Sequence, residues 1–258
     1  MSREGGEAVD WDAATYDRLA DPQEEWGREV LARLDLKGDE TVLDAGCGGG
    51  RVTRLLLERL PDGRVIGVDA SPAMIEQARE VFRDDDRVEL IASDLLELEL
   101  DDRVDVVFSN ATFHWVLDHD RLFARLAALL RPGGRIEAQC GGEGNVAEFE
   151  RAIDAIAGDE RFAPYLRSFT RPWNFAPVGS TQSRLARAGF EDARVWLERK
   201  RVEPSEPAAF LRAVGLAPLL ARLPDELHDA FVDAVIGSMP RPLVLEYVRL
   251  NISGTRGL

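Results

Sequence analysis

The stretch Asp44-Ala45-Gly46-Cys47-Gly48-Gly49-Gly50 decides the fold of this chain. It continues the apolar run Thr41-Val42-Leu43, which indicates a short strand, and it precedes residues 51–60, whose apolar side chains recur at helical spacing. Glycines at a strand-to-helix turn let the backbone turn sharply and approach a ligand closely. In open α/β sheets, ligands bind outside the carboxyl ends of the strands. The stretch therefore predicts a ligand site at the end of the first strand.

The spacing of these glycines narrows the class of ligand. A dinucleotide fingerprint that begins at Gly46 needs glycine at position 51, which is Arg51, and one that begins at Gly48 needs glycine at position 53, which is Thr53. The pyrophosphate-binding version is therefore absent, which disfavours a nicotinamide oxidoreductase. S-adenosylmethionine has no pyrophosphate, and its methionine moiety can lie along such a turn.

Two more acids follow the next two predicted strands. Asp69 ends the strand 65–69, at 23 positions after Gly46 (69 − 46), where a carboxylate can accept the hydroxyls of a ribose. Asp94 follows the strand 88–92, where a carboxylate can accept a hydrogen bond from an adenine amino group, or can simply cap a helix. Together with Asp44, these acids at successive strand ends indicate a nucleoside-containing cofactor.

The rest of the chain alternates strands and helices. Ser71-Pro72 is a helix start, with a capping serine and a proline at the first helical position. This order favours a doubly wound α/β fold around a mostly parallel sheet. Further strands are predicted at 104–108, 135–139, 193–197 and 243–252, and further helices at 120–130, at 146–157 and, as two or three short ones, within 207–239.

Composition excludes several classes of partner. The chain has 258 residues and a net charge of -15, which repels nucleic acid and anionic membranes. No apolar run approaches membrane-spanning length, and Met1–Asp10 lacks the apolar core of a signal peptide. Two cysteines, Cys47 and Cys140, favour a reducing cytoplasm. No cluster of His, Cys or acidic residues indicates a metal site, and the oligomeric state stays open.

The motifs resemble those of the class I S-adenosylmethionine-dependent methyltransferases. The matching segments are Val42-Leu43-Asp44-Ala45-Gly46-Cys47-Gly48, Val68-Asp69-Ala70-Ser71 and Ser93-Asp94-Leu95. More narrowly, the chain is similar to the trans-aconitate methyltransferase-like group. The segments that carry this resemblance are 109–119, 139–145, 215–219 and 247–249.

The resemblance implies a seven-stranded Rossmann-like sheet whose last strand is antiparallel and lies between the fifth and sixth. We expect a single domain, 1–258, with N-terminal helices in 1–38 and two helical lid insertions, 141–179 and 207–239. S-adenosylmethionine is the expected cofactor, and the metal expectation is none. The expected cofactor residues are Tyr16, Asp44, Ala45, Gly46, Cys47, Gly48, Asp69, Ala70, Ser71, Met74, Ser93, Asp94, Leu95 and Asn110.

The expected substrate is a small molecule, and the expected reaction is methylation of a carboxylate oxygen. A carboxylate needs a cationic or hydroxyl clamp rather than a base. Expected substrate residues are Trp115, Arg171, Arg241 and Tyr247. Because an antiparallel last strand begins at the active edge, Arg241 and Tyr247 are favoured there over Arg249.

Other acceptors stay open at this point. His114 is a candidate base, although packing of the turn after the fourth strand is the favoured interpretation, because methyl transfer often needs no proton acceptor. The alternatives are methylation of a hydroxyl, an amine or a carrier-protein-bound acyl group, or a non-catalytic protein that binds S-adenosylmethionine.

Overall fold

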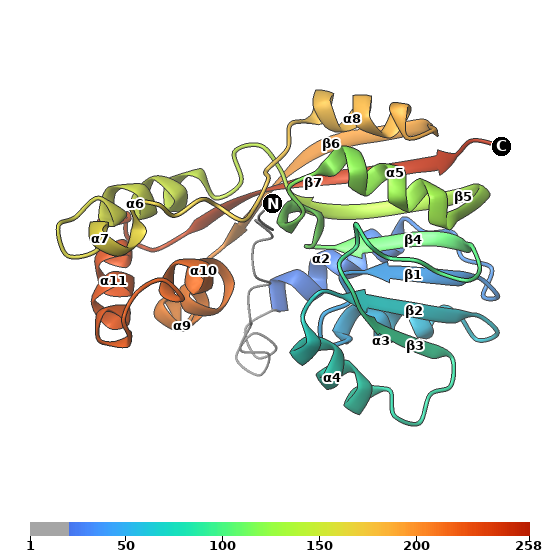
Figure 1. The fold of residues 1–258 in the computed structure, drawn as a ribbon, viewed down its shortest axis with the longest axis horizontal. Helices are drawn as coiled ribbons and strands as arrows, with labels where there is room; N and C mark the ends of the chain where they lie inside the picture. The colour runs from blue at the N-terminus through green and yellow to red at the C-terminus, as the bar shows by residue number, and fades with distance from the viewer. Residues whose placement is uncertain (1–20) are drawn as a thin grey trace, which may run out of the picture.

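The computed structural model describes residues 21–258, so Trp11 and Tyr16 lie outside the described residues. Figure 1 shows the chain with its elements labelled. In chain order the elements are α2 (Asp21–Ala32), β1 (Thr41–Ala45), α3 (Arg51–Leu57), β2 (Arg64–Asp69), α4 (Pro72–Val81), β3 (Val88–Ala92), β4 (Val104–Asn110), η1 (Phe113–Trp115), α5 (His119–Leu129), β5 (Leu130–Gly141), α6 (Ala147–Ala157), α7 (Ala163–Leu166), α8 (Val178–Arg187), β6 (Phe190–Val202), α9 (Pro207–Leu211), the π turn η2 (Arg212–Leu216), α10 (Ala217–Leu220), α11 (Asp225–Ser238) and β7 (Leu245–Arg256).

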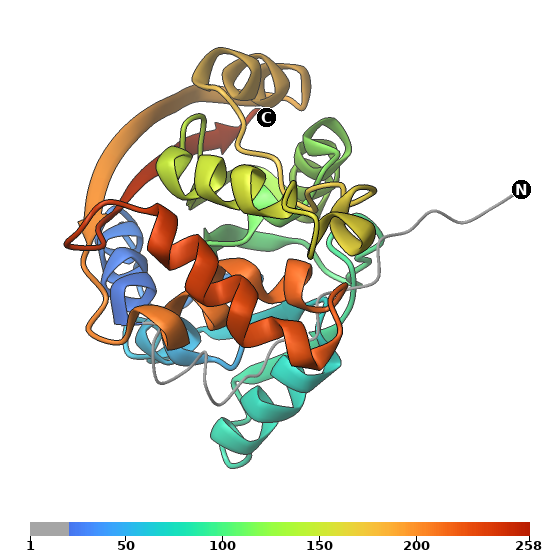
Figure 2. The same ribbon diagram turned by 90° about the vertical axis from the view of Figure 1, so that its left-hand side faces the viewer.

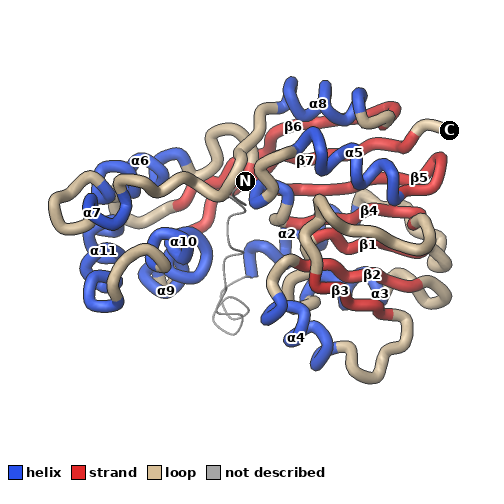
Figure 3. The backbone as a smooth tube through the Cα atoms, in the orientation of Figure 1, coloured by secondary structure: helices blue, strands red, loops and turns tan. Residues whose placement is uncertain are grey.

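The seven strands of the described chain form one sheet in the order β3-β2-β1-β4-β5-β7-β6. The pairs within β1 to β5 are parallel, and β7 is antiparallel to both β5 and β6. The tube in Figure 3 shows this sheet as one red layer with helices on its two faces. The expected topology, with the last strand inserted between the fifth and sixth, is confirmed. The carboxyl ends of β1 to β5 therefore lie at one edge, where β7 enters the sheet.

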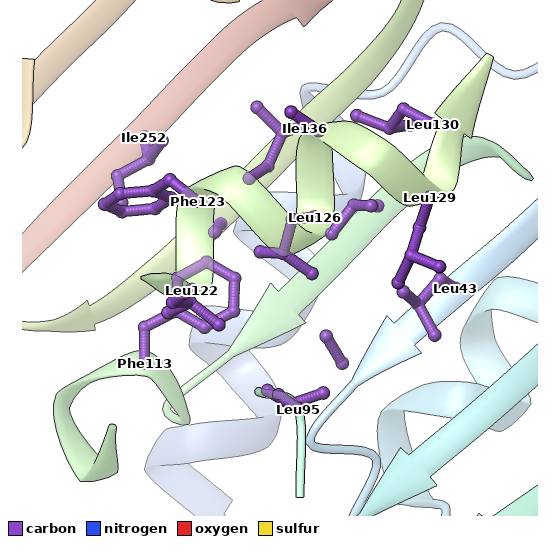
Figure 4. Close-up of a cluster of buried hydrophobic side chains, with 14 of the residues drawn as sticks. Leu43, Leu95, Phe113, Leu122, Phe123, Leu126, Leu129, Leu130, Ile136 and Ile252 are labelled. Atoms are coloured by element: carbon purple, nitrogen blue, oxygen red, sulfur yellow. The ribbon is translucent and has the colours of Figure 1, made fainter. Parts of the chain in front are cut away.

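Successive side chains along each strand point to opposite faces of the sheet and so pack into two separate cores. In β1, Val42 packs with α2, α3 and α4, whereas Leu43 packs with α5 and the turn 93–103. Figure 4 shows the second of these cores, with Leu122, Phe123 and Leu126 of α5 against the sheet. These three side chains have no exposed area. Burying each of them contributes about 1.5–3 kcal/mol.

The three strands at the β6 side are longer than expected. β5 begins directly after α5, because the segment Pro132-Gly133-Gly134 makes an irregular start to the strand. β6 and β7 have 13 and 12 residues, and their pairing continues past the end of β5 at Gly141 as far as Val202 opposite Leu245. The β6–β7 pair thus projects beyond the edge at which β1 to β5 end.

The projecting strands carry a helical cluster, defined as α6, α7 and α9 to α11. It has its own apolar core, in which the Phe162 and Phe231 rings pack edge to face with their centroids 5.1 Å apart. Figure 2 shows these helices in front of the carboxyl edge of the sheet. Neither α7 nor α8 is predicted by the sequence pattern, and α8 covers β6 rather than joining the cluster. No helix within residues 21–258 is long and apolar enough to cross a membrane.

The separate core of the helical cluster predicts separate unfolding. Phe231→Ala removes a fully buried ring and should cost about 3–5 kcal/mol. We expect faster amide hydrogen exchange in α6 and α11, with little change in β1 and β4. Phe123→Ala, in the core between α5 and the sheet, is the matched control and should accelerate exchange in β4 and β5. Equal acceleration throughout the chain in the Phe231 variant would contradict two separate cores.

Candidate active site

The glycine turn after β1 is built from left-handed backbone. Gly46, Gly48 and Gly50 have φ of 88°, 54° and 91°, a region that only glycine adopts without cost. The N–H groups of Gly46 and Cys47 both donate to the carbonyl oxygen of Val68, at 2.7 and 3.0 Å. The turn is thereby fixed to the end of β2.

The glycines of this turn are required for different reasons. A Cβ on Gly46 would clash with the side chain of Thr112, which follows β4. A Cβ on Gly50 would meet the ring of Phe82 at 2.5 Å. At Gly48, by contrast, a Cβ would have no atom within 4 Å, because this glycine faces an open cleft. Close packing thus requires glycine at positions 46 and 50, whereas glycine at position 48 keeps the cleft accessible.

Asp69 joins the turn to the helix that follows β2. One carboxylate oxygen accepts the N–H of Gly48 at 3.0 Å, and the other accepts the N–H of Ser71 at 2.9 Å. Ser71 in turn caps α4 by accepting the N–H of Met74. A carboxylate has about four acceptor positions, so Asp69 can still accept a hydrogen bond from a ligand. Burial raises the pKa of Asp69, against the backbone N–H groups that lower it.

A cleft opens in front of the turn at the carboxyl edge. It encloses about 600 Å³, part of which is open solvent. Its lining combines expected residues with others that no sequence motif indicates. The lining residues are Gln23, Glu24, Asp44, Gly46, Cys47, Gly48, Gly49, Arg51, Val52, Met74, Gln77, Phe108, Asn110 and Ala111.

The remaining described residues expected at the cofactor are not among those that line the cleft. Ala45 is fully buried, and its carbonyl accepts a hydrogen bond from the hydroxyl of Ser109. Ser93 donates its N–H to the Asp69 carbonyl, and Leu95 is buried in the core beneath. Ala70 and Asp94 are exposed. They follow the adjacent strands β2 and β3 at the carboxyl edge of the sheet.

His114 and Trp115 lie in η1, directly after β4. The imidazole of His114 is 9% exposed and packs on Trp115 and Phe175, with ring centroids 5.0 and 5.8 Å away. Trp173 extends this aromatic group, with its ring 5.7 Å from Trp115. Nδ1 of His114 accepts the N–H of Gly141 at the end of β5, at 3.3 Å. Burial, then the charge of Arg249, holds the pKa of His114 well below its usual value.

The three clamp candidates are placed differently from one another. Arg171 is ion-paired with Glu150 and Asp154, at 2.6 Å to each carboxylate. Arg241 is exposed in the segment between α11 and β7, outside the residues that line the cleft. Tyr247 is buried, with its ring 5.0 Å from that of Trp26 in α2. The structure does not bring these three side chains together.

Comparison with known proteins places the chain. A family model described as a methyltransferase domain matches residues 42–134. The trans-aconitate 2-methyltransferase of Methylobacterium radiotolerans is 32% identical over 88% of this chain and 87% of its own. That of Variovorax paradoxus is 33% identical over 87% and 86%. The chain belongs to the trans-aconitate methyltransferase-like group of class I S-adenosylmethionine-dependent methyltransferases.

Solved structures agree on the fold. Phosphoethanolamine N-methyltransferase 2 of Haemonchus contortus, solved with S-adenosyl-L-methionine, superimposes with a TM-score of 0.65 at 20% identity, over 95% of this chain and 57% of that one. The protein is therefore a methyltransferase, and its cofactor is S-adenosylmethionine.

The cleft of the methyltransferase fits this cofactor. Within residues 21–258, three buried side-chain oxygens that belong to lining residues have no hydrogen-bond donor: Oε1 of Gln23, Oε1 of Gln77 and Oδ1 of Asn110. Buried acceptors without partners are costly, so a ligand that donates hydrogen bonds would satisfy them. S-adenosylmethionine carries an ammonium group and a sulfonium charge at neutral pH, and both suit a cleft of oxygen acceptors.

Asp44 adds a titrating charge to this cleft. Its carboxyl is 2% exposed and accepts the hydroxyl of Thr53 in α3 at 2.7 Å. Burial raises the pKa of Asp44 to about 7, which the hydrogen bond from Thr53 opposes and the charge of Asp69 supports. The carboxyl therefore titrates nearer to neutral pH than an exposed aspartate does.

The sequence pattern could indicate some of the residues that line the cleft but not others. Gln77 follows Met74 by three positions, so both lie on one face of α4. Gln23 and Glu24 reach the cleft only because α2 docks there. That docking uses the Arg51–Glu24 ion pair (2.8 Å) and the bond from the Asn110 amide to the Gln23 carbonyl (2.7 Å). No local motif predicts such tertiary contacts.

The two roles of the glycines can be separated by substitution. Gly46→Ala should lower the melting temperature more than Gly48→Ala, because it adds the clash with Thr112 to the cost of about 1–2 kcal/mol for left-handed alanine. Gly48→Ala should weaken binding of S-adenosylhomocysteine more than tenfold by calorimetry, since its methyl group enters the cleft. Thr112→Gly should restore part of the stability lost in Gly46→Ala. Unchanged affinity in Gly48→Ala would argue against the cleft as the cofactor site.

The raised pKa of Asp44 predicts linked effects of pH. Its folded pKa of about 7 exceeds the ordinary value of 3.8, so its contribution to stability without ligand is lost as pH rises toward 7. Cofactor affinity should change in the opposite direction and fall below pH 7, because protonation removes the negative charge. We expect Asp44→Asn to bind weakly with no such pH dependence between pH 5.5 and 7. A wild-type pH dependence in that variant, by calorimetry, would refute the assignment.

Proposed function

We propose that this methyltransferase transfers a methyl group to a carboxylate oxygen of a small acid of the trans-aconitate type. The names of its relatives support this acceptor. The structural observation that carries the proposal is the state of His114. Its Nδ1 already accepts the Gly141 N–H, and burial disfavours its protonation. A neutral, engaged imidazole suits an acceptor that needs no base.

A carboxylate is such an acceptor. S-adenosylmethionine supplies a methyl group on a sulfonium, which departs as a neutral thioether. A carboxyl group with a pKa near 4 is ionised at pH 7, so it forms the new C–O bond with no proton to lose. The task of the chain is then to bind, orient and exclude water. Hydroxyl and amine acceptors, by contrast, must lose a proton during or after transfer.

We assign the cofactor to the cleft in front of the glycine turn. Gly48 lets the methionine part approach the backbone, and Asp44 with the amide oxygens of Gln23 and Asn110 faces its positive charges. Asp69 keeps acceptor capacity for the ribose hydroxyls while it holds the turn. Asp94, exposed after β3, is the candidate partner of the adenine amino group.

We assign the helical cluster as the lid of this site. It lies in front of the carboxyl edge, and its attachment to the projecting β6–β7 pair favours movement as one body (Figure 2). A net charge of -15 supports a small acceptor over nucleic acid. Both cysteines are free and buried, which fits a reducing cytoplasm.

The acceptor class can be tested by the product and by the effect of pH. With S-adenosylmethionine and trans-aconitate, we expect a methyl ester and S-adenosylhomocysteine in equal amounts by mass spectrometry. The rate at saturating cofactor should be nearly flat above about pH 6, because a carboxylate is already ionised there. A panel of phenols and amines is the control. Turnover of these compounds alone, with a rate that rises with pH, would replace the carboxylate by a protonated acceptor, and cofactor binding without any turnover would indicate a non-catalytic protein.

A further inference from the structure

The end of β5 brings together two side chains from distant parts of the chain. His114, after β4, is joined to Gly141 by the hydrogen bond at Nδ1. Arg249 of β7 lies directly opposite Gly141 in the antiparallel register. The charge of Arg249 also lowers the pKa of His114, after the larger effect of burial, and it acts on the neighbouring Cys140 thiol as well. Both side chains are buried, and Arg249 is only 2% exposed.

Neighbouring side chains fix the plane of the Arg249 guanidinium. Its Nε donates to the side-chain oxygen of Gln139 at 3.2 Å, and its central carbon lies 4.6 Å from the centre of the Trp26 ring. Gln139 is itself held, since its amide donates to Asn251 at 2.9 Å. A guanidinium fixed in this way is a preorganised fork that matches a carboxylate.

The hydrogen bond to Gly141 also decides the tautomer of His114. A neutral imidazole has one N–H and one acceptor nitrogen. Because Nδ1 accepts the Gly141 N–H, the proton is on Nε2. Burial keeps the ring neutral at pH 7. His114 is therefore a fixed hydrogen-bond donor at Nε2 and is poorly suited to act as a base.

This pair lies next to the cofactor cleft. Gln139, which holds Arg249, is the register partner of Asn110 in β4, and Asn110 lines the cleft. Adjacent strands are about 4.8 Å apart. Asn110 and Arg249 also contact the same helix, α2, through the Gln23 carbonyl and the Trp26 ring. The two side chains therefore share one face of the sheet at its carboxyl edge.

We propose that Arg249 and the Nε2–H of His114 bind a carboxylate of the acceptor that is not itself methylated. The proposal rests on the proposed function and deepens it. A carboxylate held by a guanidinium has its charge stabilised and is a poorer nucleophile, so a second carboxylate of the same molecule receives the methyl group. The preferred substrate class is then acids with at least two carboxylates.

The buried guanidinium of Arg249 also opposes the negative net charge of the protein. The chain carries -15, and Glu24 and Asp44 line the cleft. At long range this field disfavours an anionic substrate. Arg249 provides a positive charge at short range inside the fold, where attraction is stronger than at the surface. The clamp thus offers a local positive charge to a polyanionic acid.

The test compares a tricarboxylate with a monocarboxylate. We expect the unaltered enzyme to prefer trans-aconitate over crotonate at least a hundredfold in kcat/KM. Arg249→Met should reduce this ratio at least tenfold through KM for trans-aconitate, with S-adenosylhomocysteine affinity kept within about twofold. Arg249→Lys should recover part of the ratio. Arg33→Met is the matched control, because Arg33 also bonds Asn251 in this polar row but lies farther from the carboxyl edge.

Two measurements keep the test decisive if Arg249→Met fails to fold. His114→Asn retains an acceptor for the Gly141 N–H but has no group at Nε2, so it should lose trans-aconitate affinity while it keeps the fold. In protein labelled with 15N at its three histidines, His114 should show the Nε2–H tautomer throughout pH 6–8, with Arg249 and His119 as the charged or titrating groups near it. An Nδ1–H tautomer, or a ring that becomes protonated in this range, would overturn the clamp.

Failure of the clamp and failure of the proposed function give different results. If the unaltered enzyme methylates trans-aconitate and Arg249→Met keeps the same preference over crotonate, the clamp is refuted and the proposed function stands. If no carboxylic acid is methylated, the proposed function fails. In that case the clamp is tested by calorimetry with trans-aconitate in the presence of S-adenosylhomocysteine. Binding to the unaltered enzyme that is lost in Arg249→Met would support the clamp, and absence of binding to the unaltered enzyme would refute it.

Discussion

The site depends on one close approach of backbone, where the glycine turn after β1 passes beneath the segment that follows β4. The N–H groups of Gly46 and Cys47 share the carbonyl of Val68, and Thr112 leaves no room for a side chain on Gly46. These contacts join the ends of three adjacent strands, β2, β1 and β4. Because the three ends are fixed together, the groups that follow each strand meet around a single cleft.

Electrostatics then divide the carboxyl edge into two regions. On the side of β1 and β2, Asp44, Asp69 and the amide oxygens of the cleft offer acceptors to a positively charged cofactor. On the side of β5 and β7, the proposed donors are the guanidinium of Arg249 and the Nε2–H of His114, whose Nδ1 accepts the Gly141 N–H. Asn110 and Gln139, paired across β4 and β5, stand at the boundary. The proposed carboxylate clamp therefore lies beside the proposed cofactor cleft.

Local pattern predicted β1 to β4 closely, because each is a short apolar run bounded by turn residues and needs no partner to be recognised. It also indicated the glycine turn and the acids Asp44 and Asp69, which lie at the ends of strands, whereas Asn110 at the end of β4 was expected only from the family resemblance. It did not predict α8, whose sequence 178–187 has few apolar residues. It also could not give Gln23, since the place of α2 on the sheet follows from contacts between segments far apart in the chain.

The position of Arg249 shows a different limit of prediction from sequence. The sequence argument equated the beginning of the last strand with the active edge and so favoured Arg241 and Tyr247. The structure shows that β7 begins four residues before Arg249 and projects past β5, so that Arg249 is the residue opposite Gly141. The overshoot depends on how far β6 and β7 pair with each other, which the alternation within either strand does not specify.

The separate core of the helical cluster bears on how such an enzyme can change. The cofactor cleft rests on the two sheet cores, whereas the helices in front of it share a third core that also includes Trp26 of α2 and Leu245 and Tyr247 of β7. Substitutions that reshape these helices need not disturb the glycine turn. Insertions between β5 and α8, or between β6 and β7, can therefore accumulate without loss of the methyl donor. A lineage built on this plan can diversify the molecules it accepts while the donor half of the reaction stays unchanged.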